Sequence, residues 1–293
     1  MSFSAMLFHR VRPVAATRWP VEVALVAVMC WLLGGAASAD PLEDIEACVA
    51  SNFPKKSSAV GFELRSRHRD GFESKHEGRI YWRRAAQGRA ESLICMEQPP
   101  SVRGLAYLVL EGDSGTSVWG YLPEKQRVLR IHASAAAKRA RIGRTAISYD
   151  DLRYLPINLS GAEPGEISDS LVADRKVSVV RLSLPPGGES PYARVISFID
   201  QESCVPLRTE FYETADKLLK ILTVDPGKIR RTGGIRLAHS MTIEDLKHEV
   251  VTELRVVQVQ VDPELPDQMF VPTRLDRNQC QNPERPERDA AAD

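Results

Sequence analysis

The residues most suggestive of catalysis are Gly112-Asp113-Ser114-Gly115, an order found around the nucleophilic serine of trypsin-like proteases. Such a serine needs a general base within hydrogen-bond reach, and in those proteases the base is a histidine well upstream. Between residue 39 and Ser114 the only histidines are His68 and His76, both in charged surroundings. Because the motif also separates two apolar segments, it predicts a hairpin turn rather than a nucleophile loop.

The other motifs for catalysis and metal binding are incomplete. The chain has no C-x-x-C pair, and the His-Glu pairs that begin at His76 and His248 lack the second histidine of H-E-x-x-H. Asp150-Asp151 is predicted to begin a helix, with a catalytic carboxylate pair as the alternative. We therefore expect no enzymatic activity, no metal site and no cofactor.

A basic cluster extends from Lys125 to Arg144, with seven positive residues and no acidic one. One interpretation is that Lys138, Arg139, Arg141 and Arg144 contact a lipid headgroup, an anionic membrane or an acidic partner. The alternative is a solvated face whose charged strand edges discourage aggregation.

The N-terminus has the pattern of a secretory signal peptide. Three arginines precede an apolar run from Val21 to Leu33, which is followed by the small-residue end Ala37-Ser38-Ala39. We predict cleavage after Ala39; the alternative, a membrane anchor, is disfavoured because the run falls short of the ~20 residues that span a bilayer. Cleavage removes three basic residues and one acidic residue from the balanced 39 of each, leaving 36 and 38. This charge gives no general attraction to nucleic acid.

Four cysteines follow the predicted signal peptide: Cys48, Cys95, Cys204 and Cys280. An even number in an exported chain indicates two disulfides, for which three pairings exist. We favour Cys48 with Cys280 and Cys95 with Cys204; four free thiols are the alternative.

The rest of the chain is predicted to be mainly β-structure. A short helix begins at Asp40-Pro41 and ends before Pro54, and the apolar period then changes to two. We expect about ten to eleven antiparallel strands, with a β-bulge at Val256-Val257, where the alternation slips. The region 133–176 shows no clear strand and is interpreted as short helices or a lid. Residues 40–275 are taken as one domain and 276–293 as a mostly disordered tail.

Five segments in this order resemble the bacterial outer-membrane lipoprotein-sorting family, which shares the fold of the periplasmic lipoprotein carriers (LolA-like and LolB-like). They are "PPSVRGLAYLVLEGDSGTSVWGYLPEKQRVLRI", "ISYDDL", "FIDQESCVPLRTEFYETADKLLKILTV", "GGIRLAHSMTIEDLKHEVVTELRV" and "LPDQMFVPTRLDR", spread over residues 99–277. The resemblance implies a strongly curved antiparallel sheet, an incomplete β-barrel, whose concave face is covered by short helices and a lid. It also implies an apolar cavity for acyl chains.

The function implied by this resemblance is that of a monomeric periplasmic carrier or chaperone. It would bind the acyl chains of a lipid or lipoprotein and pass them between membrane complexes, such as an inner-membrane exporter and an outer-membrane acceptor. The alternative is a regulatory sensor of the same fold that binds lipoprotein and a partner protein without transport; an undetected hydrolase is a third class.

Candidate lipid-binding residues follow from alternation along the strands. Because "LAYLVL" is apolar on both faces, it is covered on both or faces a ligand on one. The candidates are Leu105, Tyr107, Val109, Trp119, Tyr121, Val195, Leu207, Phe211, Met241 and Ile243. The alternative is that these ten residues form ordinary core beneath the helices.

Overall fold

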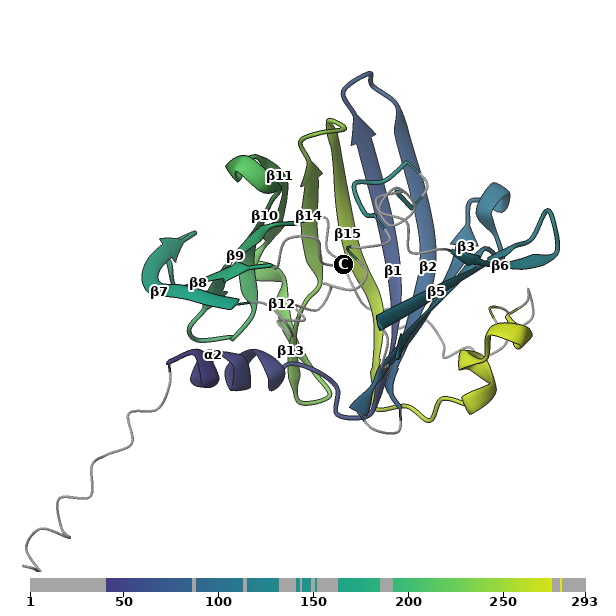
Figure 1. The fold of residues 1–293 in the computed structure, drawn as a ribbon, viewed down its shortest axis with the longest axis horizontal. Coiled ribbons are helices and arrows are strands. Elements are labelled where there is room, and N and C mark those ends of the chain that lie inside the picture. The colour runs from purple at the N-terminus through teal and green to yellow at the C-terminus, as the bar shows by residue number, and fades with distance from the viewer. Residues whose placement is uncertain are drawn as a thin grey trace, which may run out of the picture. The chain divides into compact units, whose positions relative to one another are not determined.

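One antiparallel sheet of 13 strands dominates the structure (Figure 1). The structure is a computed structural model and describes residues 41–85, 88–112, 115–131, 141–142, 144–148, 151, 163–184, 192–275 and 280. The strands of the N-terminal half are β1 (Ser57–His68), β2 (Glu73–Arg84), β3 (Ala90–Gln98), β4 (Ala106–Gly112), β5 (Gly115–Leu122) and β6 (Arg127–Ile131). Those of the C-terminal half are β7 (Glu163–Val172), β8 (Arg175–Ser183), β9 (Arg194–Asp200), β10 (Pro206–Tyr212), β11 (Leu218–Val224), β14 (Ser240–Asp245) and β15 (Val250–Val261).

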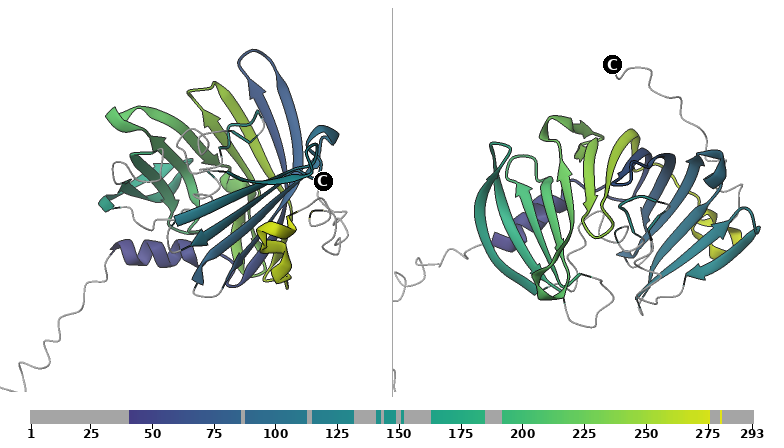
Figure 2. Two further views of the ribbon diagram at one scale, coloured as in Figure 1. Left: turned by 45° about the vertical axis from the view of Figure 1, so that its right-hand side comes forward. Right: turned by 90° about the horizontal axis from the view of Figure 1, so that it is seen from above.

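The order of the strands in space is β6-β5-β4-β3-β2-β1-β15-β14-β11-β10-β9-β8-β7. The first and last strands of the chain, β1 and β15, therefore pair with each other in the middle of the sheet. Figure 2 shows from above that the sheet curves into an arch whose two edges stay apart. The predicted mainly β fold, with a strongly curved and unclosed sheet, is thus confirmed.

The sheet contains more strands than predicted. The extra edge strand, β7, lies within the region 133–176, where we expected none. Its sequence, EPGEISDSLV, is polar because an edge strand has one partner and does not need an apolar face on both sides. A separate hairpin precedes β14: β13 (Ile235–Ala238) pairs with β12 (Ile229–Thr232).

The predicted β-bulge in the last strand is present. Phe62 pairs with Val256 and Gly61 with Gln258, which leaves Val257 as the additional residue of β15. The side chain of Val257 is 65% exposed, whereas Val256 is directed at the core. Because of the bulge, Val256 faces the core while the next residue, Val257, faces solvent.

The helices are few and short. Helix α2 (Pro41–Ala50) begins with proline, which suits the first helical turn, and turns Leu42, Ile45 and Val49 toward the core. The 3-10 turns are η2 (Pro100–Val102), η3 (Thr214–Asp216), η4 (Pro226–Lys228), η5 (Asp267–Phe270) and η6 (Pro272–Arg274). None of the helices in the described ranges is long and apolar enough to cross a membrane.

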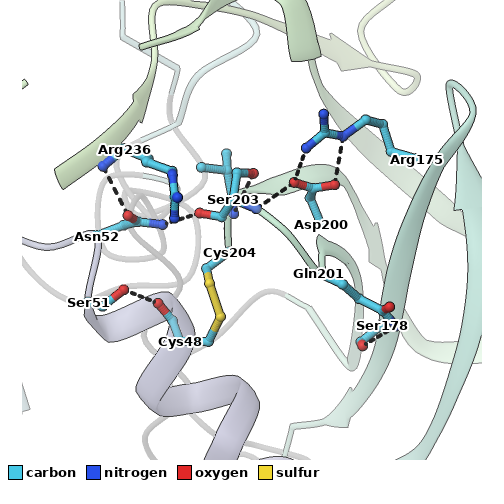
Figure 3. Close-up of a disulfide and its surroundings, with 11 residues drawn as sticks. Cys48, Ser51, Asn52, Arg175, Ser178, Asp200, Gln201, Ser203, Cys204 and Arg236 are labelled. Carbon is cyan, nitrogen blue, oxygen red and sulfur yellow. Dashed lines mark hydrogen bonds and ion pairs between the residues drawn. A yellow bond between two sulfur atoms is a disulfide. The ribbon is translucent and has the colours of Figure 1, made fainter. Parts of the chain in front are cut away.

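Both disulfides exist, but their predicted pairing is wrong. Cys48 bonds to Cys204, and Cys95 bonds to Cys280. Cys95 alternates with Ile94 along β3 and faces the outer side of the sheet, where the segment after β15 lies, so that it meets Cys280. Cys48 is on α2 beside the turn between β9 and β10, which carries Cys204 (Figure 3).

Two further contacts hold the end of α2 in place. The side chain of Asn52 donates to the carbonyl of Ser203 (2.7 Å) and accepts from the backbone N–H of Arg236 (2.9 Å). The turn between β9 and β10 is fixed by Asp200, whose carboxylate binds the guanidinium of Arg175 at 2.9 and 2.6 Å. The helix, the β9–β10 turn and the β12–β13 hairpin are therefore joined at one place.

We predict that Cys48→Ala with Cys204→Ala lowers the free energy of unfolding by about 2–5 kcal/mol, because the bridge closes a long loop. Urea unfolding measures the loss. The matched control, Cys95→Ala with Cys280→Ala, removes the other bridge. Hydrogen exchange should increase around Phe53 only in the first variant and around Phe270 only in the second; the same pattern in both would contradict the separate roles.

Candidate ligand-binding cavity

The register of the sheet determines which side chains face its concave side. Phe62 on β1 pairs with Gly78 on β2 and with Val256 on β15, and Gly78 pairs with Met96 on β3. Residues paired across strands share a face, so this row and the rows two residues away point inward. A Cβ on Gly78 would lie 2.7 Å from the Phe62 ring, so the glycine makes room for that ring.

An apolar cavity of about 290 Å³ lies against this inner face. Its walls come from the central strands, the end of α2, the β12–β13 hairpin and part of the chain between β6 and β7. It is lined by Asn52, Phe53, Pro54, Ser58, Val60, Phe62, Leu64, Ile80, Trp82, Ser92, Ile94, Met96, Ile142, Ile147, Ile235, Leu237, Met241, Leu254, Val256 and Val259. Three of these twenty side chains are polar, so the cavity suits an apolar ligand.

A cover segment, defined here by its described residues 141–142, 144–148 and 151, closes one side of the cavity. Ile142 and Ile147 contribute to the cavity wall. Polar contacts hold the segment: the Nε2 of His68 lies 2.7 Å from the carbonyl oxygen of Arg144, and the N–H of Ala146 donates to the hydroxyl of Thr252 (2.8 Å). The cover is thus attached to β1 and β15 by a few hydrogen bonds.

An ion pair anchors the far end of the cover. The Nζ of Lys220, on the inner face of β11, lies 2.5 Å from the carboxylate of Asp151, and both side chains are buried. The hydroxyls of Tyr192 and Ser148 also donate to this carboxylate, at 2.5 and 2.8 Å. Since Asp151 is the close partner of both Lys220 and Ser148, it anchors the cover to β11.

Comparisons with known proteins agree with this geometry. A family model described as an uncharacterized protein matches residues 88–277. The chain belongs to this family. No curated protein matches the chain.

Solved structures share the architecture. A domain from Vibrio parahaemolyticus described as outer membrane lipoprotein-sorting is 22% identical, with a TM-score of 0.70 over 80% of this chain and 97% of the other. A DUF1329 family protein from Desulfovibrio piger is 20% identical, with a TM-score of 0.72 over 81% and 100%. A LolA superfamily protein from Nitrosomonas europaea is 21% identical, with a TM-score of 0.62 over 80% and 98%. The chain has the LolA-like fold, as its sequence motifs implied.

The LolA-like sheet places the ten predicted lipid-binding residues in three environments. Met241 lines the cavity. Tyr107 and Val109 lie on the inner side of β4, Leu105 directly precedes this strand, and none of the three is among the cavity residues. The other predicted residues of the C-terminal half form a second group in the buried core. That second group is Val195, Leu207, Phe211 and Ile243.

The candidates Trp119 and Tyr121 lie on the other face of the sheet from Tyr107 and Val109. Tyr107 pairs with Gly120, because the β4–β5 hairpin closes on the pair Gly112 and Gly115. Trp119 and Tyr121 consequently face the outer side, where they pack with the cluster beneath the C-terminal segment. The two-residue connection between β4 and β5 fixes this register. The alternation in the sequence suggests instead that Trp119 and Tyr121 share the face of Tyr107.

The same hairpin answers the question raised by the GDSG motif. Strand β4 ends at Gly112 and β5 begins at Gly115, so the predicted turn joins two paired strands. Asp113 and Ser114 themselves lie outside the described residues.

The residues that line the cavity were mostly missed. They lie on β1, β2, β3 and β15, where residues that point inward alternate clearly with residues that point outward. Phe62 and Leu64 on β1, and Ile80 and Trp82 on β2, are inward residues of this kind. We recognised this alternation as strand but gave it no binding role. The signal that distinguishes a cavity wall from solid core is the pairing of β1 with β15, which the sequence does not display.

Two residues of the basic cluster, Arg141 and Arg144, have contacts in the structure. The guanidinium of Arg144 lies 3.9 Å from the ring centroid of Phe72 and 3.5 Å from Asp70, so it attaches the cover to the β1–β2 turn. Arg141 is half-buried and pairs through its backbone with Ser148. Lys138 and Arg139 lie outside the described residues.

We predict that Lys220→Met lowers the free energy of unfolding by about 3–5 kcal/mol, because it leaves the Asp151 carboxylate buried without its cation. Tryptic cleavage after Arg144 should also become faster as the cover detaches. The matched control is Lys217→Met on the neighbouring exposed pair with Glu213, where less than about 1 kcal/mol is expected. A Lys220→Met protein as stable as the control would show that the ion pair does not anchor the cover.

A second prediction concerns pH. His76 faces the interior beside Leu64, its Nδ1 has no hydrogen-bond partner, and burial lowers the pKa of its imidazole. Below about pH 6.5 the unfolded chain takes up a proton that the folded protein excludes, so the free energy of unfolding falls as pH falls through this range. His76→Asn should reduce the difference measured by urea unfolding between about pH 7.5 and about pH 5.5. Equal slopes in the wild-type protein and in His76→Asn would contradict the assignment.

Proposed function

We propose that this protein binds the acyl chain of a lipid or lipoprotein in the periplasm and carries it between membrane complexes. The observation that supports the proposal most directly is the apolar cavity on the concave face of a LolA-like fold. The lipoprotein-sorting role named for the Vibrio relative agrees with such a use. The two disulfides fit an oxidising compartment, and the predicted signal peptide provides the route of export.

The size of the cavity sets the amount of ligand it accommodates. A methylene group occupies roughly the volume of a water molecule, ~30 Å³, so about 290 Å³ holds about ten carbons of one chain. At ~0.8 kcal/mol for each methylene removed from water, this corresponds to about 8 kcal/mol. Such a gain retains an acyl chain in the protein while leaving release within reach of a membrane complex.

Loading requires movement of the cover. Ile142 and Ile147 form part of the cavity wall, while Asp151 attaches the cover to Lys220. Detaching these contacts enlarges the cavity toward the inner face of the C-terminal half, where the predicted residues Val195, Leu207, Phe211 and Ile243 lie. In this proposal those residues contact longer chains in the open state, and an inner-membrane exporter and an outer-membrane acceptor supply and remove the ligand.

A regulatory sensor of the same fold is the second candidate. The observation that favours it is the cavity volume, because room for one partial chain is enough to detect an acylated protein without shielding all its chains. Such a sensor would bind lipoprotein and a partner protein through the basic residues Lys138, Arg139 and Arg141, and would transport nothing.

We predict that acyl lipid copurifies with the protein and is detected by mass spectrometry of organic extracts. Val256→Trp, which fills the cavity, should remove most of this lipid, while Val257→Trp, at the exposed neighbouring position, should retain it. Circular dichroism verifies that both variants fold. Absence of lipid from all three proteins, together with no uptake of added fatty acid, would reject the binding function.

Transfer experiments distinguish the carrier from the sensor. A labelled acyl lipid should move from donor to acceptor vesicles in the presence of the wild-type protein and not in the presence of Val256→Trp. Binding without acceleration of transfer would favour the sensor.

A further inference from the structure

Two segments that border the cavity carry exposed cations. Asn52, Phe53 and Pro54 line the cavity, and Lys55 and Lys56 follow them directly in the chain. On the other side, Ile235 and Leu237 of β13 line the cavity within a hairpin that contains no acidic residue. The cations of this hairpin and its approach are Lys228, Arg230, Arg231 and Arg236.

The hairpin register brings one arginine to the cavity side. Arg230 pairs with Leu237, and Thr232 pairs with Ile235, so these four residues share one face of the hairpin. Because Leu237 and Ile235 line the cavity, the aliphatic part of Arg230 extends along the same side and its guanidinium reaches solvent.

The two basic segments lie close together. The backbone N–H of Arg236 donates to the side chain of Asn52, as Figure 3 shows. The turn of the hairpin packs on the end of β15, since a Cβ on Gly233 would lie 2.6 Å from the side chain of Val261. In Figure 1 the hairpin and the end of α2 that leads to Lys55 lie at the same end of the sheet. We call the six cations, Lys55, Lys56, Lys228, Arg230, Arg231 and Arg236, the basic rim.

No side chain of the basic rim forms an ion pair within the described part of the chain. By contrast, Arg65 and Arg67 of the central strand β1 form ion pairs with Glu63 and Glu73. The nearby carboxylate of Asp262 accepts hydrogen bonds from the backbone N–H groups of Lys56 and Ser57, which lower its pKa together with the lysine charges. Burial, with the charge of Arg230, lowers the pKa of His239. The end of the sheet beside the apolar cavity therefore carries several cations, with Arg230 on the cavity side of the hairpin and Arg231 and Arg236 on its other side.

We infer that the ligand is an amphiphile with an anionic headgroup, whose acyl chain enters the cavity while its phosphate or carboxylate contacts the basic rim. This inference rests on the proposed function and specifies its ligand class. Guanidinium groups bind phosphate and carboxylate with paired hydrogen bonds, and lysines add charge. A ligand with a neutral headgroup fills the same cavity but leaves the six cations without a counterion.

The test compares monomeric lysolipids that have the same acyl chain and different headgroups. Lysophosphatidylglycerol should bind about tenfold or more tightly than lysophosphatidylcholine, because its phosphate charge is not offset within the headgroup, whereas the choline cation of lysophosphatidylcholine offsets its phosphate and is repelled by the rim. The fatty acid of equal chain length should follow the anionic lipid, and the difference should decrease as salt is added. Isothermal titration calorimetry or displacement of a fluorescent fatty acid measures these affinities.

The matched variants remove three charges at two places. Arg230→Gln with Arg231→Gln and Arg236→Gln should abolish the headgroup preference and leave the affinity for lysophosphatidylcholine unchanged. Lys125→Gln with Arg127→Gln and Lys247→Gln removes three exposed cations elsewhere and should leave both affinities unchanged.

The outcomes separate this inference from the proposed function. Equal binding of both lysolipids to the wild-type protein overturns the anionic ligand and leaves acyl binding intact, whereas binding of neither overturns both. Inorganic phosphate that binds alone as tightly as the lipid would indicate an anion site independent of the acyl chain. Loss of binding to anionic vesicles in the rim variant, with unchanged uptake of monomers, would make the rim a membrane-docking surface. Either of these last two results overturns the inference.

Discussion

The connection between β6 and β7 imposes the main constraint on this fold. These strands are consecutive among the described strands of the chain, yet they form opposite edges of a 13-stranded sheet. Consecutive elements usually lie side by side, so this long connection is an exception that has to pass from one edge to the other. Its described part, including Ile142 and Ile147, lies on the concave face and forms part of the cavity wall. The cover is thus a product of topology, and the same chain that joins the two halves closes the cavity.

The cover is held in place by apolar contacts and by a small number of polar contacts. Its isoleucines contribute burial, while the Asp151–Lys220 pair fixes its position. A buried ion pair adds little net stability compared with an apolar pair of similar size, but it strongly penalises positions in which one partner is left alone. The cover therefore has a well-defined closed position, and a ligand or membrane complex that supplies an alternative partner to either charge can shift it. The closed position of the cover depends on this contact.

The sequence predicts the β-architecture because alternation and turn residues are local signals. The bulge at Val257 and the GDSG hairpin follow from such signals, and the apolar "LAYLVL" segment is covered on both faces, one side by core and the other by the C-terminal segment. The errors concern relations between distant residues. Three features depend on how remote strands meet: the face of the sheet on which Trp119 lies, the cysteine that bonds to Cys48, and the pairing of β1 with β15. Strand β7 was missed because an edge position removes the apolar pattern on which recognition depends.

The two bridges have a consequence for biosynthesis. Each joins a cysteine of the first hundred residues to one more than 150 positions later, with separations of 156 and 185. A chain that enters an oxidising compartment N-terminus first presents Cys48 and Cys95 to each other long before their native partners arrive. Their premature bond would trap an incomplete molecule, since thiol exchange is needed to undo it. Formation of both native bridges therefore requires that Cys48 and Cys95 stay reduced, or exchange again, until Cys204 and Cys280 are present.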